Sequence, residues 1–200
     1  MSITVDHQAR KAEILQKALE LFARQGYPGV TFQQLADCCG LARTALYKYF
    51  QNKRDVFDSA IALMVQKLGR EFRQDSEKNK CLGAGEKLIL VMDKVLQYIF
   101  ANPLLLQAIT EYLIDQRRMG EDVSVKVRRH TVVMRWTLIQ LLREGVASGE
   151  FRPLDCRLTA DLLYALLEAA ALRVAVTDTA DHSDLNIACK AAITSLRLKH

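Results

Sequence analysis

The chain has 200 residues, of which 50% are hydrophobic and 26% are charged, and its formal net charge is +5. Enough of the residues are apolar to form a substantial core in one or two domains. Residues 1–10 lack the apolar segment of a signal peptide, and residues 162–167, the longest apolar run of the most apolar helix, are too few to span a membrane. We therefore expect a cytoplasmic protein with no membrane partner.

The cysteines and histidines do not show the spacings of a catalytic or metal site. The five cysteines are odd in number and include no Cys-x-x-Cys motif, and the four histidines are widely separated. No nucleophile motif or glycine-rich phosphate loop is present. We therefore expect no enzyme, no metal and no cofactor. The adjacent Cys38 and Cys39 are interpreted as small hydrophobic residues, with redox sensing as the alternative.

Apolar residues recur at helical spacing along almost the whole chain, which predicts an all-α fold. The first helix ends at Gly26 and places one apolar stripe toward the core, formed by Ile14, Leu15, Ala18, Leu21 and Phe22.

Residues 26–54 predict two short helices joined by a glycine turn. The first begins at Thr31, whose hydroxyl can cap the opening turn while Gln34 completes a capping box. Gly40 provides the turn, and the second helix covers residues 43–50. Ala42 stands at the start of this helix and cannot cap it, which costs about 1 kcal/mol of local stability.

The outer face of this segment carries side chains suited to DNA. Arginine can donate two hydrogen bonds to a guanine edge, threonine can contact a base, and tyrosine and lysine suit phosphates. Residues 1–54 have eight Lys and Arg against four Asp and Glu, an excess that suits a polyanion, although alone it would be ordinary surface charge. The candidate DNA-binding residues are Thr31, Gln33, Arg43, Thr44, Tyr47, Lys48, Tyr49 and Lys53.

Several of these positions together resemble the DNA-binding domain of the TetR-like family of bacterial transcription regulators. The resemblance covers roughly residues 10–58 and rests on Gly26-Tyr27, Thr31, Leu46-Tyr47-Lys48-Tyr49-Phe50 and Lys53. It departs from the family at Ala42, where members usually have Ser or Thr. The resemblance implies a three-helix helix-turn-helix DNA-binding domain, placed at residues 1–54, and a helical effector-binding and dimerisation domain at residues 55–200.

Beyond the motif, the spacing predicts a helix that is capped by Asn52 and runs toward Arg73, then a polar loop at residues 74–85. Further helices are expected at about residues 86–101, 104–118, 122–147, 155–176 and 184–198. The last two could form a four-helix bundle with the same pair of a second subunit, as the family usually does. The alternative is that they complete a monomeric core.

Amphipathic and adaptable side chains on the middle helices could line an effector cavity. The candidate ligand-binding residues are Met92, Tyr98, Tyr112, His130, Met134 and Trp136. The alternative is that they are core and rim residues without a ligand.

The sequence thus predicts a homodimeric, sequence-specific DNA-binding transcriptional regulator. As a repressor it would leave its palindromic operator when a small-molecule effector changes the spacing of the two recognition helices through the helix after Asn52. The alternative is a ligand-binding or scaffolding helical protein without regulated operator binding.

Overall fold

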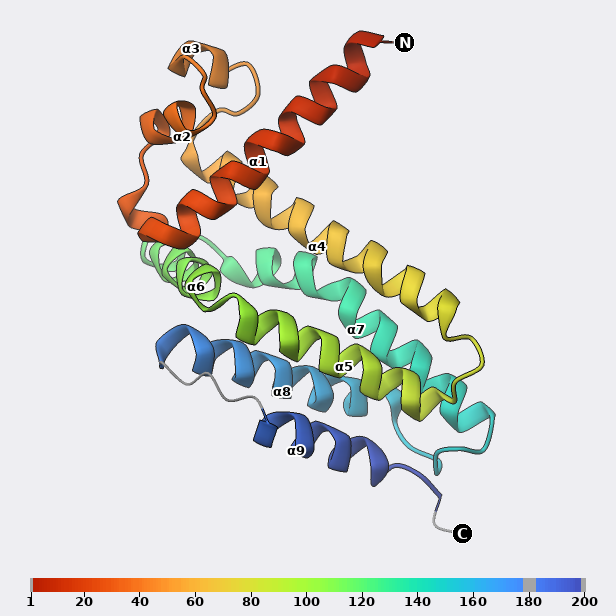
Figure 1. The fold of residues 1–200 in the computed structure, drawn as a ribbon. Coiled ribbons are helices and arrows are strands. Elements are labelled where there is room, and N and C mark those ends of the chain that lie inside the picture. Colours follow the sequence, from red (N-terminus) through yellow and green to blue (C-terminus); the bar gives the residue numbers. More distant parts are fainter. Residues whose placement is uncertain (1, 178–182, 199–200) are drawn as a thin grey trace. The chain divides into compact units, whose positions relative to one another are not determined.

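The computed structural model describes residues 2–177 and 183–198, and the regular elements among them are helices (Figure 1). The prediction of an all-α fold is confirmed. Within the described residues, the only extended pairing is an isolated bridge between Phe151 and Arg197. The chain forms two compact units, unit 1 with Met1–Leu68 and Leu104–Val123, and unit 2 with Gly69–Pro103 and Ser124–His200.

Unit 1 contains α1 (Ser2–Gly29), α2 (Phe32–Cys38), α3 (Arg43–Leu46), the first part of α4 (Lys53–Lys78) and most of α6 (Pro103–Arg118). The stripe predicted for the first helix is confirmed, because all five of its residues are buried in one core cluster. Gly26 interrupts α1 with φ +70°, so the predicted helix end is also found in the backbone.

An aromatic cluster holds α1, α4 and α6 together within unit 1. The Tyr112 ring of α6 lies 4.6 Å from the rings of both Tyr27 and Phe57, measured between centroids. Phe57 also meets the edge of Phe22 at 4.8 Å. Edge-to-face and offset pairs of this kind contribute stability beyond the area that they bury. Helix α6 is therefore an integral part of the core that supports α1 and α4.

Unit 2 contains the last part of α4 with α5 (Ala84–Ala101), most of α7 (Val123–Ala147), α8 (Cys156–Val176) and α9 (Ser183–Thr194). Helix α5 packs against α8 and α9, which also contact each other (Figure 1). The buried side chains of these elements include Leu88, Met92, Leu96, Leu138, Leu142, Leu163, Leu167 and Ile193.

The predicted ends of α4 and α9 were wrong, and both were changed by contacts distant in sequence. Helix α4 continues to Lys78, and the Asp75 carboxylate in its last turns pairs with Lys94 of α5. Helix α9 ends at Thr194 because the chain beyond it pairs with residues 150–152: the Arg152 N–H donates to the Leu196 carbonyl at 3.0 Å. Local spacing does not reveal such partners.

Among the described residues, no single helix is both long enough and apolar enough to cross a membrane. Helices α5 and α6 reach that length and apolar composition only when they are taken together, and the chain bends by 85° between them.

Candidate nucleic-acid interface

The start of α2 is fixed by the predicted capping box. The Thr31 hydroxyl accepts a hydrogen bond from the Gln34 N–H at 3.2 Å, and the Gln34 side chain accepts one from the Thr31 N–H at 2.8 Å. Two otherwise unpaired backbone donors are thus satisfied. The inner face of α2 buries Leu35 and Ala36 in the core of unit 1.

The turn and the recognition helix follow the prediction in part. Gly40 has φ +65°, and the Leu41 N–H closes the turn on the Ala36 carbonyl at 2.9 Å. The regular helix α3 is shorter than predicted, because after Leu46 the chain winds in tighter turns, with the Tyr49 N–H donating to the Leu46 carbonyl. Ala42 provides no side-chain cap, as expected.

Most of the predicted DNA-binding residues are exposed to solvent. Arg43 donates to the Tyr47 hydroxyl at 3.2 Å, and the Tyr47 ring lies 4.6 Å from that of Phe32, between centroids. These contacts hold two candidate readers in a defined arrangement before any DNA is bound. The exposed members are Thr31, Gln33, Arg43, Thr44, Tyr47 and Lys48, whereas Tyr49 and Lys53 are half-buried.

Lys53 is already engaged within unit 1. Its ammonium donates to the Tyr27 carbonyl at 3.0 Å and lies 4.4 Å from the centre of the Tyr27 ring. Burial lowers the pKa of Lys53 from its ordinary value. A phosphate contact by Lys53 stays a prediction, and Lys48 is the more accessible cation beside α3.

Two residues near the interface were missed by sequence reasoning. The imidazole of His7 stacks on the Tyr49 ring at 4.6 Å, and the Lys11 ammonium lies 5.1 Å from the centre of the Phe50 ring. Both residues come from α1, more than 30 positions earlier in the chain. The helical spacing of α1 could not have shown that this end of the helix lies beside the end of the recognition segment.

Polar contacts connect α6 and the turn after it to α1 and α4. The Tyr112 hydroxyl donates to Asp58 at 2.6 Å, and the Tyr27 N–H donates to Glu111 at 3.1 Å. Arg54 makes two hydrogen bonds of 2.9 Å to Glu121. Burial raises the pKa of Tyr27 to about 12, and burial and the Asp58 contact raise the pKa of Tyr112. Both phenols are therefore protonated at neutral pH.

The six predicted effector residues are divided between the units. Tyr112 lies in the core of unit 1, whereas Met92 is buried in unit 2 and Trp136 on α7 is 61% exposed. Tyr98 and Met134 are half-buried, and the side chain of His130 lies outside the described residues. A shallow groove of about 300 Å³ in unit 2 is lined by other residues, namely Leu82, Glu86, Ile89, Leu90, Asp93 and Lys190. An effector site at the six residues stays a prediction.

Helix α8 is apolar on two faces, as predicted. One face is buried in unit 2 and consists of Ala160, Leu163, Leu167, Ala170 and Val174. The opposite face is exposed and repeats at steps of four and three residues; this outer stripe consists of Leu158, Leu162, Ala165, Ala169, Leu172 and Val176. Leu158, Leu162 and Val176 are each more than 60% exposed. On α9, Ile193 faces the core whereas Ile187 is 65% exposed.

Comparison with known proteins agrees with this architecture. The family described as bacterial regulatory proteins, tetR family, matches residues 14–60. The fatty acid metabolism regulator protein of Bacillus subtilis (strain 168) is 28% identical over 159 residues, which are 78% of each chain. The nucleoid occlusion factor SlmA of Klebsiella pneumoniae (strain 342) is 30% identical over 163 residues, covering 80% of this chain and 79% of that protein.

Solved structures show the same fold over nearly the full length. A TetR transcription regulator from Haloarcula marismortui has a TM-score of 0.84 with 19% identity, covering 96% of this chain and all of that chain. The transcriptional regulator FadR of Bacillus subtilis in complex with stearoyl-CoA has a TM-score of 0.73 with 23% identity, covering 92% and 96%. The chain belongs to the TetR family of bacterial regulatory proteins and is a DNA-binding, helix-turn-helix transcriptional regulator.

Proposed function

We propose that this regulator is a homodimeric repressor that binds a palindromic operator through α2 and α3 and leaves it when a small amphipathic effector binds. The observation that carries the proposal is the exposed group of Arg43, Thr44, Tyr47 and Lys48 on a segment whose other face is anchored by Leu46 and Phe50. A segment fixed on one side and rich in donors on the other is suited to reading a major groove.

The outer stripe of α8 supports the homodimer. Its steps of four and three residues form the seam that two helices use when they pack side by side. A continuous apolar surface of this kind marks an interaction site. Two-fold pairing through α8 and α9 would bury the stripe and present two recognition segments to the two halves of a palindrome.

The roles of Arg43 and Lys48 can be separated by alanine substitution, with DNA selected from a random pool as the operator. We expect Arg43→Ala to cost about 1 to 3 kcal/mol of operator binding and to relax base preference at one symmetric pair of positions. Lys48→Ala should weaken operator and random DNA alike and reduce the slope of affinity against salt. Fluorescence anisotropy on both DNAs at several salt concentrations measures the difference. Equal losses of specific and random binding in both variants would mean that Arg43 does not read bases.

Two relatives support a long-chain acyl-CoA as the effector class. The Bacillus subtilis relative carries the name fatty acid metabolism regulator protein, and the FadR structure of the same fold holds stearoyl-CoA. An acyl-CoA combines a long apolar chain with an anionic head. The apolar chain would suit Met92 and Met134 of unit 2, which adapt to irregular shapes. An exposed basic residue of the same unit, such as Arg128, would suit a phosphate.

Hydrogen bonds within unit 1 would provide a route for the signal. The contacts of Tyr112 with Asp58 and of Glu111 with Tyr27 join α6 to α4 and α1. Helix α4 itself runs without a break from unit 1 into unit 2. A displacement of α4 or α6 would therefore move the support of the recognition segment. The effector acts only if it binds the released arrangement more tightly than the DNA-bound one.

Saturating stearoyl-CoA should lower operator affinity by about 5- to 150-fold, the usual range of coupling between two sites. Operator DNA must then weaken acyl-CoA binding by the same factor, which titrations with and without DNA would measure. Trp136 is the only tryptophan and provides the fluorescence signal. Free coenzyme A is the control for the anionic head alone. An acyl-CoA affinity that is identical with and without operator would exclude this effector class.

A further inference from the structure

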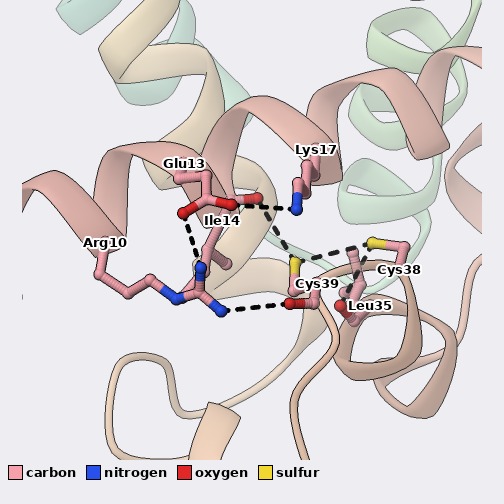
Figure 2. A network of polar contacts seen from close by, with 7 residues as sticks. All are labelled: Arg10, Glu13, Ile14, Lys17, Leu35, Cys38 and Cys39. Atoms are coloured by element: carbon pink, nitrogen blue, oxygen red, sulfur yellow. Dashed lines mark hydrogen bonds and ion pairs between the residues drawn. The ribbon is translucent and has the colours of Figure 1, made fainter.

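The end of α2 carries two thiols side by side. Cys38 is the last residue of the helix and Cys39 is its C-terminal cap, and their sulfur atoms are 3.7 Å apart (Figure 2). The Cys38 side chain is exposed, whereas Cys39 is only 4% exposed. The pair therefore has one accessible thiol and one that belongs to the core.

Cys39 connects α1 to the turn that leads into α3. Its thiol faces the Ile14 carbonyl at 3.9 Å, and its own carbonyl accepts a hydrogen bond from Arg10 at 3.3 Å (Figure 2). Glu13 holds Arg10 at 2.6 Å and Lys17 at 3.0 Å, so the neighbouring cations are paired with a carboxylate. A change at Cys39 would disturb both the contact between the helices and the start of the Gly40 turn.

The geometry favours a third atom that bridges the two sulfurs, rather than a direct disulfide bond between Cys38 and Cys39. Adjacent Cα atoms are about 3.8 Å apart across a trans peptide, closer than the usual 4.4 Å minimum in disulfides, and the sulfurs would have to approach to about 2.05 Å. Burial raises the pKa of the Cys39 thiol to about 12, so this thiol is protonated at neutral pH. A bridging atom of a soft element requires much less approach of the two sulfurs.

We propose that Cys38 and Cys39 form a dithiol site for trivalent organoarsenicals and that its occupation weakens DNA binding. An arsine oxide, R–As=O, condenses with both thiols to R–As(S–Cys)₂. Two S–H bonds break and two As–S bonds form, the oxygen leaves as water with both protons, and no oxidation state changes. The exposed Cys38 reacts first, and the adjacent Cys39 closes the ring at high effective concentration. The Cys39 sulfur then leaves its place against Ile14.

Phenylarsine oxide added to the full-length protein tests the site by intact mass spectrometry. We expect one adduct that survives excess monothiol and is removed by dithiothreitol, because only a second dithiol competes with a chelate. Cys38→Ser and Cys39→Ser should each lose the monothiol-resistant adduct, whereas Cys81→Ser, which changes an exposed thiol in unit 2, should retain it. Cys38 is exposed, so its serine variant keeps the fold. A resistant adduct in Cys38→Ser, or none in the wild-type protein, would overturn the site.

The effect on DNA rests on the proposed function and is measured separately. Arsenical-treated wild-type protein should bind selected DNA at least about tenfold more weakly, with recovery after dithiothreitol, and Cys38→Ser should not respond. A resistant adduct with unchanged DNA affinity would overturn the link between the dithiol and the recognition segment. If untreated protein selects no DNA sequence, the proposed operator binding fails, while the adduct measurement still decides whether the dithiol site exists.

Discussion

Ala169→Glu should convert the proposed homodimer into a folded monomer and lower operator affinity by about 10² to 10⁴-fold. Ala169 lies in the middle of the outer stripe of α8 and is exposed in a single copy, so glutamate there does not disturb the core of unit 2. In the proposed bundle the two carboxylates would be buried without partners, which strongly disfavours association. The loss of affinity follows because the two recognition segments no longer bind as one bivalent unit.

Analytical ultracentrifugation gives the mass of the variant, and helical circular dichroism shows whether it is folded. Leu162→Glu tests a second position of the same stripe and should behave alike. Ala147→Glu is the matched control, since it adds the same charge at an exposed helical position off α8. A folded Ala169→Glu dimer with normal operator affinity would place the interface elsewhere.

The parts of the fold that the sequence predicted correctly depend on short-range signals. Thr31 and Gln34 cap α2, Gly40 makes the turn, and Asn52 caps the start of α4 through the Asp55 N–H at 2.9 Å. Each signal involves residues no more than five positions apart, so its physical effect is complete within the segment. The capping and turn residues of the helix-turn-helix could therefore be predicted from the sequence, whereas the DNA contacts of its outer face stay predictions.

The contacts that were missed join residues far apart in the chain. Tyr112 and Asp58 are 54 positions apart, and Tyr27 and Glu111 are 84 apart. Helical spacing showed that Tyr112 could face inward, but it could not show that its partners are α1 and α4 of unit 1. For the same reason the engagement of Lys53 by Tyr27 was not foreseen. The predicted effector residues remain untested because spacing does not identify what an apolar face contacts.

Gly26→Ala should destabilise the protein by about 2.5 to 6 kcal/mol. Gly26 has φ +70° and ψ 162°, a backbone region that is essentially restricted to glycine and costs a residue with a Cβ about 1–3 kcal/mol. The added Cβ would also lie 2.6 Å from the Glu111 carboxylate and displace it. The Tyr27 N–H, which donates to that carboxylate at 3.1 Å, would lose a charged acceptor worth about 1.5–3 kcal/mol. Urea unfolding followed by circular dichroism measures the total.

Gly40→Ala shows the cost of a positive φ without a clash, because Gly40 has φ +65° and nothing lies within 4 Å of an added Cβ. This variant should lose only the conformational contribution of about 1–2 kcal/mol. In a Glu111→Ala background the clash and the lost hydrogen bond no longer exist, so Gly26→Ala should then cost only its conformational contribution of about 1–3 kcal/mol. The coupling energy of this double-mutant cycle measures how strongly Glu111 of α6 holds the end of α1. Gly26→Ala could instead cost the same free energy of unfolding with and without the Glu111 carboxylate. That result would mean that the contact between Glu111 and Tyr27 does not join α6 to α1.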